Sequence, residues 1–489
     1  MRFSAVTIWQ SFIFSLIRSK VDTILSIIKT VNSYLTDYVL ILLLVGVGIL
    51  FTIRTRAVQI RCFGEGMKQV FGSLNKKSDK KGVSSFQALA TAVAAQVGTG
   101  NIVGASGAIL VGGPGAIFWM WIIAFLGMAT IYAEAILAQK TRVVNEDGSI
   151  LGGPIYYIKK AFKNKFGKFL AVFFAVATTL ALGFMGAMVQ SNSVVNNFTG
   201  VFSQFGADTK VVSIIVGVIV AAIASVVLVG GVKRLAAVTS KLVPIMACLY
   251  LAGGVFVLIV NAQNVLGAFG MIFKYAFVPQ AIIGGVLGTA IKKAISQGAK
   301  RGLFSNEAGM GSTPHAHALA DVESPHKQGV TAMIGVFIDT FVVLTMTALI
   351  VISTLYFDGT ITSAGAIEGV TSANMVQLAF IKSFSAVFGE SVGSIIGSIF
   401  VAVCLFFFAF STIISWNFFG KVNFEYLFGK KSLIIYSVVS IGFIFLGSIL
   451  SNDLVWELTD FFNYLMVLPN ALALIVLSGV VAKSAKTKK

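Results

Sequence analysis

The residues Val97-Gly98-Thr99-Gly100-Asn101 interrupt an apolar stretch, SFQALATAVAAQVGTGNIVGASGAI, that covers residues 85–109. Two glycines and two polar side chains stand where an uninterrupted lipid-spanning helix would carry apolar residues. Polar groups at that depth are costly and usually serve a function. Glycines at four-residue spacing can also serve only close helix packing, and that alternative stays open. We interpret residues 97–101 as a break in a membrane-spanning helix.

The composition of the whole chain indicates a protein whose solvent is lipid. Hydrophobic residues make up 57% and charged residues 11% of its 489 residues, whereas an ordinary soluble domain carries about 25% charged residues. Several apolar segments approach or exceed the roughly 17–25 residues that a spanning helix needs. They cover residues 36–53, 85–109, 114–138, 170–197, 211–231, 242–261, 276–291, 330–356, 390–418, 432–450 and 461–482. We therefore expect an all-α membrane protein with about 11 transmembrane helices.

The distribution of Lys and Arg predicts the orientation of the chain. If the residues before the first segment lie outside, the regions inside hold 30 of the 37 cations. These regions are residues 54–84, 139–169, 232–241, 292–329, 419–431 and the tail from 483. Because Lys and Arg mark cytoplasmic loops, we expect the N-terminus outside and a basic cytoplasmic tail at 483–489. The net charge of +18 then reflects topology, and nucleic-acid binding is not expected.

The N-terminal segment and the rare side chains carry fewer signals. Residues 1–35 contain an apolar stretch too short to span and no signal-peptide cleavage site, so we expect an extracytoplasmic segment resting on the membrane. The three cysteines fall in a cytoplasmic loop or in spans, so no extracellular disulfide is expected. His315, His317 and His326 fall in one expected cytoplasmic loop without a neighbouring cysteine. We expect solvated or helix-capping histidines rather than a metal site.

Ten segments follow the first span at 36–53, and they divide into two sets of five at 85–261 and 276–482. An odd number of spans makes the two sets opposite in orientation, which is the inverted-repeat plan of many secondary transporters. The second set also begins with an interrupted segment, AFVPQAIIGGVLGTAI at 276–291. We expect two broken helices and a binding site between them, with Gly284 and Gly285 facing the substrate from the second.

Several long strings resemble the alanine/glycine:cation symporter family. They are QVGTGNIVGASGAILVGGPGAIFWMWIIAFLGMATIYAEAILAQ (96–139), GGPIYYI (152–158), RGLFSNEAGMGSTPHAHALA (301–320), FIDTFVVLTMTAL (337–349) and FAFSTIISWNFFGKVNFEYLFG (408–429). The resemblance covers roughly residues 36–480. It implies a LeuT-type fold, in which a five-helix unit is repeated in inverted orientation after one extra N-terminal helix. It also implies uptake of small amino acids coupled to sodium or, in some members, to protons.

A broken helix would supply groups for a zwitterionic substrate. Backbone N–H groups near Gly98, Thr99 and Gly100 would bind the carboxylate. Asn101 would contact the substrate or a cation, and it would equally cap the second half-helix. The resemblance places Gln190 against the substrate, although a glutamine in a span can also serve only to bond neighbouring helices.

Oxygen ligands for a monovalent cation are expected near residue 410. The Phe408 carbonyl and the Ser411 and Thr412 hydroxyls are spaced i, i+3 and i+4, so they share one helix face. Hard cations prefer such oxygens. By analogy with LeuT-type carriers, the carbonyls of Ala94 and Val97 would complete a sodium site. Hydroxyls in spans also bond back to their own helix, and that alternative stays open.

Further residues are expected to shape the pocket and its gates. Trp416 would close one side of the pocket and restrict it to small amino acids, unless it is an interfacial tryptophan. Glu134 and Asp339 are the acids within the expected spans that do not stand among a span's first two residues, and we interpret them as structural or gating groups. The Gly-rich stretch 298–318 is expected to be a cytoplasmic loop in which Glu307 acts in closing the inner gate.

We predict a secondary active transporter in the inner membrane of a bacterium or archaeon. It would import alanine or glycine by sodium symport, with sodium, the amino acid and the lipid bilayer as its partners. Neither a cofactor nor an enzymatic activity is expected, and the oligomeric state is left open. Two alternatives remain. The same scaffold could be driven by protons through Asp339 or Glu134, or it could serve as a channel or a non-transporting nutrient sensor.

Overall fold

The computed structural model describes residues 20, 22–73, 82–146, 149–278, 287–362 and 365–486. Of these residues, nine helices are long and apolar enough to cross a membrane, and one bent pair of helices makes ten. The pair joins Ser85–Gln96 to Gly100–Gly112. This architecture confirms the expected all-α membrane protein.

The chain enters the bundle through one helix of 33 residues, Asp22–Arg54. This helix contains the π-helical η1 (Leu35–Leu40) and α2 (Ile41–Arg54), and the short helices α3 (Val58–Arg61) and α4 (Phe63–Ser73) follow it. Residues 22–35 thus extend the helix that contains the expected first span, and the expected extracytoplasmic placement of this segment stays a prediction. The expected surface placement of residues 1–19 lies outside the described residues.

The first set of helices contains a broken helix, a small hairpin and four long helices, of which one joins α9, η3 and α10. Its elements are α5 (Ser85–Gln96), η2 (Gly100–Gly104), α6 (Ala105–Gly112), α7 (Gly115–Thr141), β1 (Val143–Val144), β2 (Ile150–Leu151), α8 (Pro154–Ala161), α9 (Lys165–Thr178), η3 (Thr179–Met185), α10 (Gly186–Ser203), α11 (Thr209–Val229) and α12 (Gly231–Val260). β1 and β2 are antiparallel, with Val143 opposite Leu151. The connecting helix α13 (Ala262–Phe277) follows.

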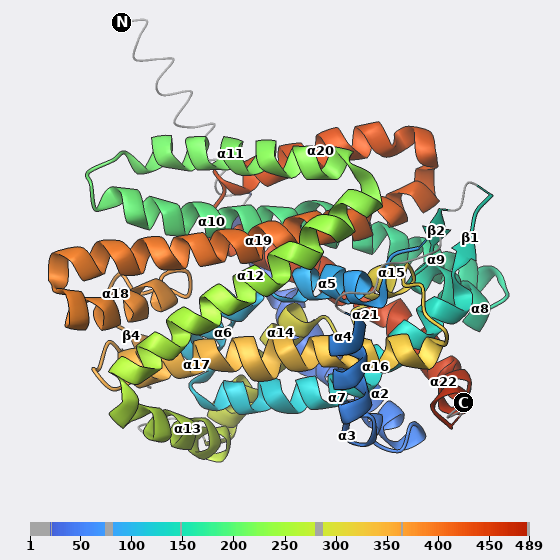
Figure 1. Cartoon of the computed structure of the whole chain (residues 1–489), viewed down its shortest axis with the longest axis horizontal. Helices are drawn as coiled ribbons and strands as arrows, with labels where there is room; N and C mark the ends of the chain where they lie inside the picture. Colours follow the sequence, from blue (N-terminus) through green and yellow to red (C-terminus); the bar gives the residue numbers. More distant parts are fainter. Residues whose placement is uncertain are drawn as a thin grey trace, which may run out of the picture.

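The second set of helices contains a similar series of elements. Its elements are α14 (Leu287–Asn306), α15 (Pro314–His317), α16 (Pro325–Val336), η4 (Phe337–Leu344), α17 (Thr345–Val351), η5 (Ile352–Tyr356), β3 (Ile361–Thr362), β4 (Gly365–Ala366), α18 (Met375–Phe388), α19 (Glu390–Phe428), η6 (Lys430–Ser432), α20 (Leu433–Gly447), α21 (Asn452–Val476) and α22 (Ser478–Lys486). β3 and β4 are antiparallel, with Ile361 opposite Ala366. In Figure 1 the β1–β2 hairpin, α8 and α22 gather at one end of the bundle, and α13, α18 and β4 gather at the other.

Local sequence explains where several of these helices begin and end. The Ser84 hydroxyl accepts a hydrogen bond from the Gln87 backbone N–H, and the Gln87 side chain accepts one from Ser84 N, so a capping box starts α5. The 39-residue α19 is bounded by Gly389 and Gly429, whose φ angles of 82° and 78° favour glycine. These signals determine where the two helices that supply the central site begin or end.

One predicted segment is placed differently. The sequence predicts a span at 276–291 followed by a cytoplasmic region at 292–329. In the structure α14 begins at Leu287 and carries four cations, three of which pair with acids at the end of the bundle expected to lie outside. Lys292 Nζ lies 3.0 Å from Asp37 Oδ2, and Lys300 Nζ lies 2.8 Å from Asp460 Oδ2. If the four cations of α14 are counted as outside, the regions expected inside still hold 26 of the 37 cations. The excess of Lys and Arg on the inner side therefore persists.

Candidate functional site

Two helix breaks meet at the centre of the bundle. The first separates α5 from η2 and α6, and the two halves are bent by 46°. α5 ends at Gln96, and Val97 leaves the helical region with φ −80° and ψ 86°. η2 begins at Gly100, so the break predicted from the sequence is confirmed at 97–99. Gly100 packs against α14, because an added Cβ would lie 3.1 Å from the Ser305 Cα.

The second break lies between α14 and α15, at residues 307–313. Glu307, Gly309 and Gly311 have φ angles of 57°, 90° and 83°, and such a backbone costs a residue with a side chain about 1–3 kcal/mol. Every residue from 302 to 320 is buried. The expected cytoplasmic loop at 298–318 is therefore wrong, because this stretch forms part of the core. The expected break at Gly284 and Gly285 lies outside the described residues.

Hydrogen bonds join the two breaks. Gln96 Nε2 donates to the Asn306 carbonyl oxygen (2.7 Å). Asn101 Nδ2 donates to Asp339 Oδ1 (2.6 Å), and the Ser305 hydroxyl donates to both oxygens of the same carboxylate (3.0 and 2.9 Å). Hydrogen bonds to a charged group stabilise by about 1.5–3 kcal/mol each. Asp339, carried by η4, thus connects the first broken helix to the second.

Backbone N–H groups of the first break donate to side-chain oxygens. Gly98 N donates to Asn101 Oδ1 (3.0 Å), and Thr99 N donates to Gln190 Oε1 (3.2 Å). Gln190 lies on α10 and is fully buried. Its Nε2 and the Thr99 hydroxyl have no hydrogen-bond partner among the described residues. Since a buried polar atom without a partner is costly, a polar ligand between Thr99 and Gln190 would be stabilised.

Oxygen atoms from α5 and α19 gather beside this break. Thr412 Oγ1 lies 3.0 Å from the Ala94 carbonyl oxygen and 3.1 Å from that of Phe408. Ser411 Oγ lies 3.2 Å from the Ala94 oxygen and 2.8 Å from the Phe408 oxygen. These residues are fully buried, and such oxygens suit a hard cation. The structure brings these predicted ligands together, and Val97, the remaining one, is the C-cap of α5.

Trp416 forms a wall of the same region. It is 1% exposed, so it is a core side chain and not an interfacial tryptophan. Its indole covers Gly186 of α10, where an added Cβ would overlap the ring, and it lies edge-on to the Phe304 ring at 5.5 Å. The Trp416 Nε1–H donates to Glu307 Oε1 (2.5 Å), and the Ser312 hydroxyl donates to the other carboxylate oxygen. Glu307 therefore lies at the centre of the bundle, and its action in closing the inner gate stays a prediction.

Glu134 is the core acid that satisfies the second break. Its carboxylate accepts from Gly309 N (3.2 Å), Gly311 N (3.1 Å) and Asn470 Nδ2 (2.6 Å). Among the described residues, none of the three core acids forms an ion pair with Lys, Arg or His. Glu134 instead replaces the helical partners that the unwound backbone has lost. Sequence reasoning missed Asn470, although an amide in an apolar segment is a signal of such a role.

A layer of charged and aromatic side chains lies between α14 and α21. Arg301 Nη1 lies 3.5 Å from Asp460 Oδ2, which also contacts Lys300. The Arg301 guanidinium stacks over the Trp456 indole at 4.5 Å, and the Phe304 ring lies 4.8 Å from the same indole. Because Phe304 also touches Trp416, this layer adjoins the central site. Sequence reasoning missed it, although Trp456 and Asp460 stand one helical turn apart.

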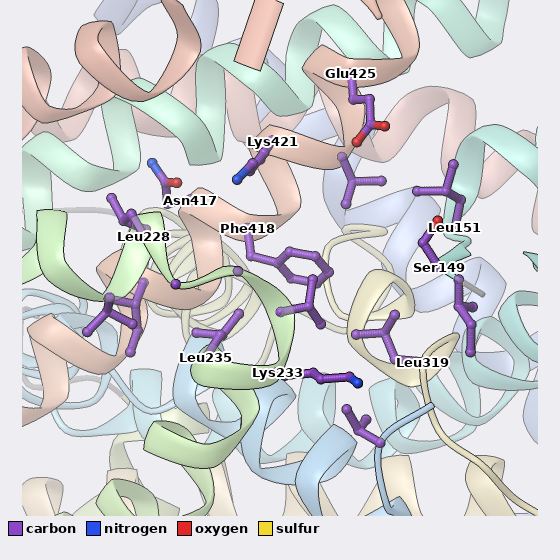
Figure 2. A pocket seen from close by; sticks show the side chains of 18 of the residues that line it. Ser149, Leu151, Leu228, Lys233, Leu235, Leu319, Asn417, Phe418, Lys421 and Glu425 are labelled. Carbon is purple, nitrogen blue, oxygen red and sulfur yellow. The ribbon is translucent and has the colours of Figure 1, made fainter. Parts of the chain in front are cut away.

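A pocket of about 560 Å³ lies further along α19, beyond the turn that carries Trp416. The β1–β2 hairpin, the α11–α12 turn and α19 line it. Figure 2 shows Phe418 at its centre, with Lys421 and Glu425 of α19 on one side and Lys233 of α12 on the other. The pocket thus combines an apolar floor with three cations, Lys233, Lys421 and Lys430, and one acid.

The expected solvation of the histidines is wrong for two of them. His315 is 1% exposed and His317 is fully buried. The His315 Nδ1 lies 2.7 Å from the Ser312 carbonyl oxygen, so this ring does cap the second break. His326 stands on α16 and lies beside Glu65 and Cys62, a cysteine that is distant in the sequence. Packing of α4 on α16 produces this proximity, which spacing along the chain could not indicate.

Comparisons with known proteins agree with one another. A model of the sodium:alanine symporter family matches residues 21–488. The sodium/alanine symporter AgcS of Methanococcus maripaludis is 40% identical over 94% of this chain and 96% of its own length. The probable sodium/glutamine symporter GlnT of Bacillus subtilis is 37% identical over 94% and 90%. The crystal structure of MhsT in complex with L-phenylalanine matches with a TM-score of 0.59 at 14% identity, over 83% of this chain and 98% of MhsT.

Proposed function

Since the chain belongs to the sodium:alanine symporter family, we propose that it imports alanine or glycine together with sodium. Family membership makes it a cation-coupled amino-acid transporter with a LeuT-type fold, and not an enzyme. The observation that carries the finer proposal is the oxygen cluster of Ala94, Phe408, Ser411 and Thr412. This cluster lies directly beside the N–H groups of the first break.

In this proposal sodium binds to the carbonyl oxygens of Ala94, Val97 and Phe408 and to the hydroxyls of Ser411 and Thr412. A hydroxyl and a carbonyl oxygen that share a hydrogen bond each keep another lone pair. The present contacts of 2.8–3.2 Å between these oxygens therefore do not prevent sodium from binding to them. The cation would draw the end of α5 toward the middle of α19.

The substrate carboxylate would replace the Gln190 oxygen at the first break. It would accept hydrogen bonds from Thr99 N and from Gln190 Nε2, close to the N–H groups of Gly98 and Gly100. The partial positive charge at the start of the half-helix η2–α6 favours an anion there. The opposite end of the zwitterion would face the carboxyl end of α14 at Asn306, where the helix dipole favours an ammonium group.

The walls of the site favour a small side chain. Trp416 and Phe304 are large and buried, and Trp416 is fixed by its bond to Glu307. The named relatives include carriers described for alanine and for glutamine. These two amino acids differ in the size of their side chains. We therefore assign alanine and glycine ahead of glutamine.

Alternating access would use both ends of this site. Lys300, Arg301 and Asp460 would close the outer side, and the pocket beside Phe418 and Lys421 would release the substrate inside. The N-terminus would lie outside and the C-terminus in the cytoplasm, as the distribution of Lys and Arg favours. We assign the two inverted units to α5–α12 and α14–α21.

Uptake into proteoliposomes tests this function. Purified protein should accumulate radiolabelled alanine under an inward sodium gradient and not after replacement of sodium by potassium. One sodium ion moving down 100 mV releases about 2.3 kcal/mol, which supports roughly fortyfold to fiftyfold accumulation. Unlabelled glycine should compete strongly and glutamine weakly. Uptake that is indifferent to sodium, or preferential inhibition by glutamine, would contradict the proposal.

Proton coupling is the second candidate, and one observation favours it. The core acids Glu134, Asp339 and Glu307 form no ion pair within the described chain, so each could bind a proton without leaving a cation unpaired. Uptake that persists without sodium and collapses with a protonophore would support this candidate. Binding of alanine without any flux would instead favour a sensor.

A further inference from the structure

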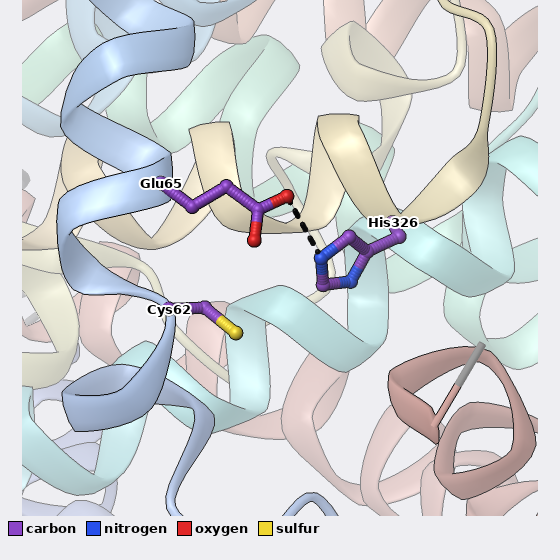
Figure 3. Close-up of side chains that lie close together, drawn as sticks. All are labelled: Cys62, Glu65 and His326. Atoms are coloured by element: carbon purple, nitrogen blue, oxygen red, sulfur yellow. Dashed lines mark hydrogen bonds and ion pairs between the residues drawn. The ribbon is translucent and has the colours of Figure 1, made fainter. Parts of the chain in front are cut away.

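Away from the transport site, three side chains with metal-binding atoms converge where α4 packs on α16. Cys62 stands between α3 and α4, Glu65 lies in the first turn of α4, and His326 lies in the first turn of α16. A thiol sulfur, a carboxylate oxygen and an imidazole nitrogen from these residues lie within 4.8 Å of one another. Figure 3 shows the His326 ring facing Glu65, with the Cys62 sulfur next to it.

The separation of two of these atoms matches a tetrahedral metal site. Zinc bonds of about 2.0–2.1 Å to oxygen and nitrogen predict an oxygen–nitrogen separation of about 3.3 Å. His326 Nε2 lies 3.2 Å from Glu65 Oε1. In the same site the sulfur would lie about 3.6 Å from the oxygen and from the nitrogen. Glu65 is exposed and can adjust, whereas Cys62 is buried at the helix junction.

The other nitrogen of the imidazole has the partner that a ligating histidine needs. His326 Nδ1 lies 2.7 Å from the Tyr132 hydroxyl of α7. Histidines that bind a metal through one nitrogen usually donate the other N–H to an oxygen, which fixes the ring and its tautomer. Tyr132 therefore orients Nε2 toward Glu65, and this feature is independent of the distances among the three ligands.

The scaffold under these ligands is tightly packed. A Cβ added to Gly66 would lie 2.7 Å from the Val330 carbonyl oxygen and 2.8 Å from Ile334 Cγ1, so the backbones of α4 and α16 approach closely there. Gly66 adjoins Glu65, and Val330 lies one turn after His326. The two ligand-bearing helices are thus fixed in register by packing before any metal binds.

We propose that Cys62, Glu65 and His326 form a site for a zinc-class divalent cation, with a solvent molecule as the fourth ligand. Thiolate and imidazole select such a metal over magnesium or calcium, which prefer oxygen ligands throughout. A thiolate and a carboxylate together balance the charge of the dication. The thiol proton is released to solvent when the metal binds.

A bound zinc ion would hold α4 against α16. The helix α16 continues into η4, which carries Asp339. This consequence rests on the proposed transport function, because it predicts that bound zinc slows uptake. Asp339 bonds to both broken helices, so a clamp on α16 would restrict the element through which they communicate. Binding of the metal can be measured without transport, so failure of the site and failure of the transport proposal are distinguishable.

Equilibrium dialysis of the full-length protein in detergent against radioactive zinc tests the site. We expect one zinc per chain, with affinity reduced about tenfold or more in Cys62→Ser and His326→Gln. Cys248→Ser removes an exposed thiol on α12 and is the matched control. Cobalt binding gives a second readout, because a thiolate-to-cobalt absorption band should appear in the wild type and vanish in Cys62→Ser. Absence of zinc binding, or equal loss in the control, would overturn the proposal.

Discussion

An alanine at residue 98 is expected to damage the cation site by displacing one hydroxyl. A Cβ added to Gly98 would overlap Thr412 Oγ1 and would lie 3.2 Å from Thr412 Cβ and 3.3 Å from Gln190 Oε1. The Thr412 side chain must therefore rotate away from the Ala94 and Phe408 oxygens that it now contacts at 3.0 and 3.1 Å. Sodium would lose one ligand as a result.

The magnitude follows from the charge of the ion. An interaction between a polar group and a charge contributes about 1.5–3 kcal/mol, which corresponds to a change in affinity of roughly 10-fold to 150-fold. The sodium concentration for half-maximal alanine uptake should rise by that factor in Gly98→Ala. Gly104→Ala is the matched control on the same broken helix, because the nearest atom to its added Cβ is 3.9 Å away.

A variant that combines Gly98→Ala with Thr412→Ala tests whether the effect of the added methyl group passes through the Thr412 hydroxyl. If Gly98→Ala acts through the Thr412 hydroxyl, then Gly98→Ala combined with Thr412→Ala should be no worse than Thr412→Ala alone. Sodium dependence should be measured by titration of uptake in proteoliposomes at equal protein content. Additive losses in the double variant, or an unchanged half-maximal concentration in Gly98→Ala, would refute the account of this contact.

Three further substitutions address other parts of the site. Asp339→Asn replaces an acceptor of several hydrogen bonds by a side chain that also carries donors. Uptake should therefore fall at least tenfold, and the melting temperature should drop. Wild-type values for both would contradict the role assigned to this acid. Trp416→Phe keeps an aromatic wall but loses the bond to Glu307, so maximal uptake should fall several-fold while competition by glutamine, measured in the same assay, stays weak. Asp460→Asn weakens the buried pair with Lys300 and should raise the half-saturating alanine concentration. Asp453→Asn, in a pair exposed to solvent, should have little effect. Equal effects of Asp460→Asn and Asp453→Asn would argue against an outer gate.

The first half of the site could be predicted from sequence because its signals are local. The break at 97–99 follows from glycines and polar residues in an otherwise apolar stretch. The cation ligands on α19 follow from the spacing of Phe408, Ser411 and Thr412 on one helix face. The start of α5 at Ser84 follows from a capping box. Each of these signals lies within a few residues of the feature that it predicts.

The second half was misplaced because its physical cause is a set of distant contacts. The four cations of α14 lower its hydropathy, so only its first residues, 287–291, fall within the span predicted at 276–291. The partners of three of these cations, Asp37 and Asp460, are far away in the sequence. The break at 307–313 resembled a surface loop because its polar backbone is satisfied by Glu134 and Asn470, which lie on other helices. Sequence patterns report composition, and these contacts exist only after the helices pack.

Dual-label flux through wild type and Thr412→Ala tests the central claim most directly. Radioactive sodium and alanine should enter wild-type proteoliposomes together, each dependent on the other, and in Thr412→Ala both fluxes should need a sodium concentration roughly 10-fold to 150-fold higher while the protein stays folded. Alanine uptake in Thr412→Ala that keeps the wild-type sodium dependence would contradict the claim that this oxygen cluster couples the two.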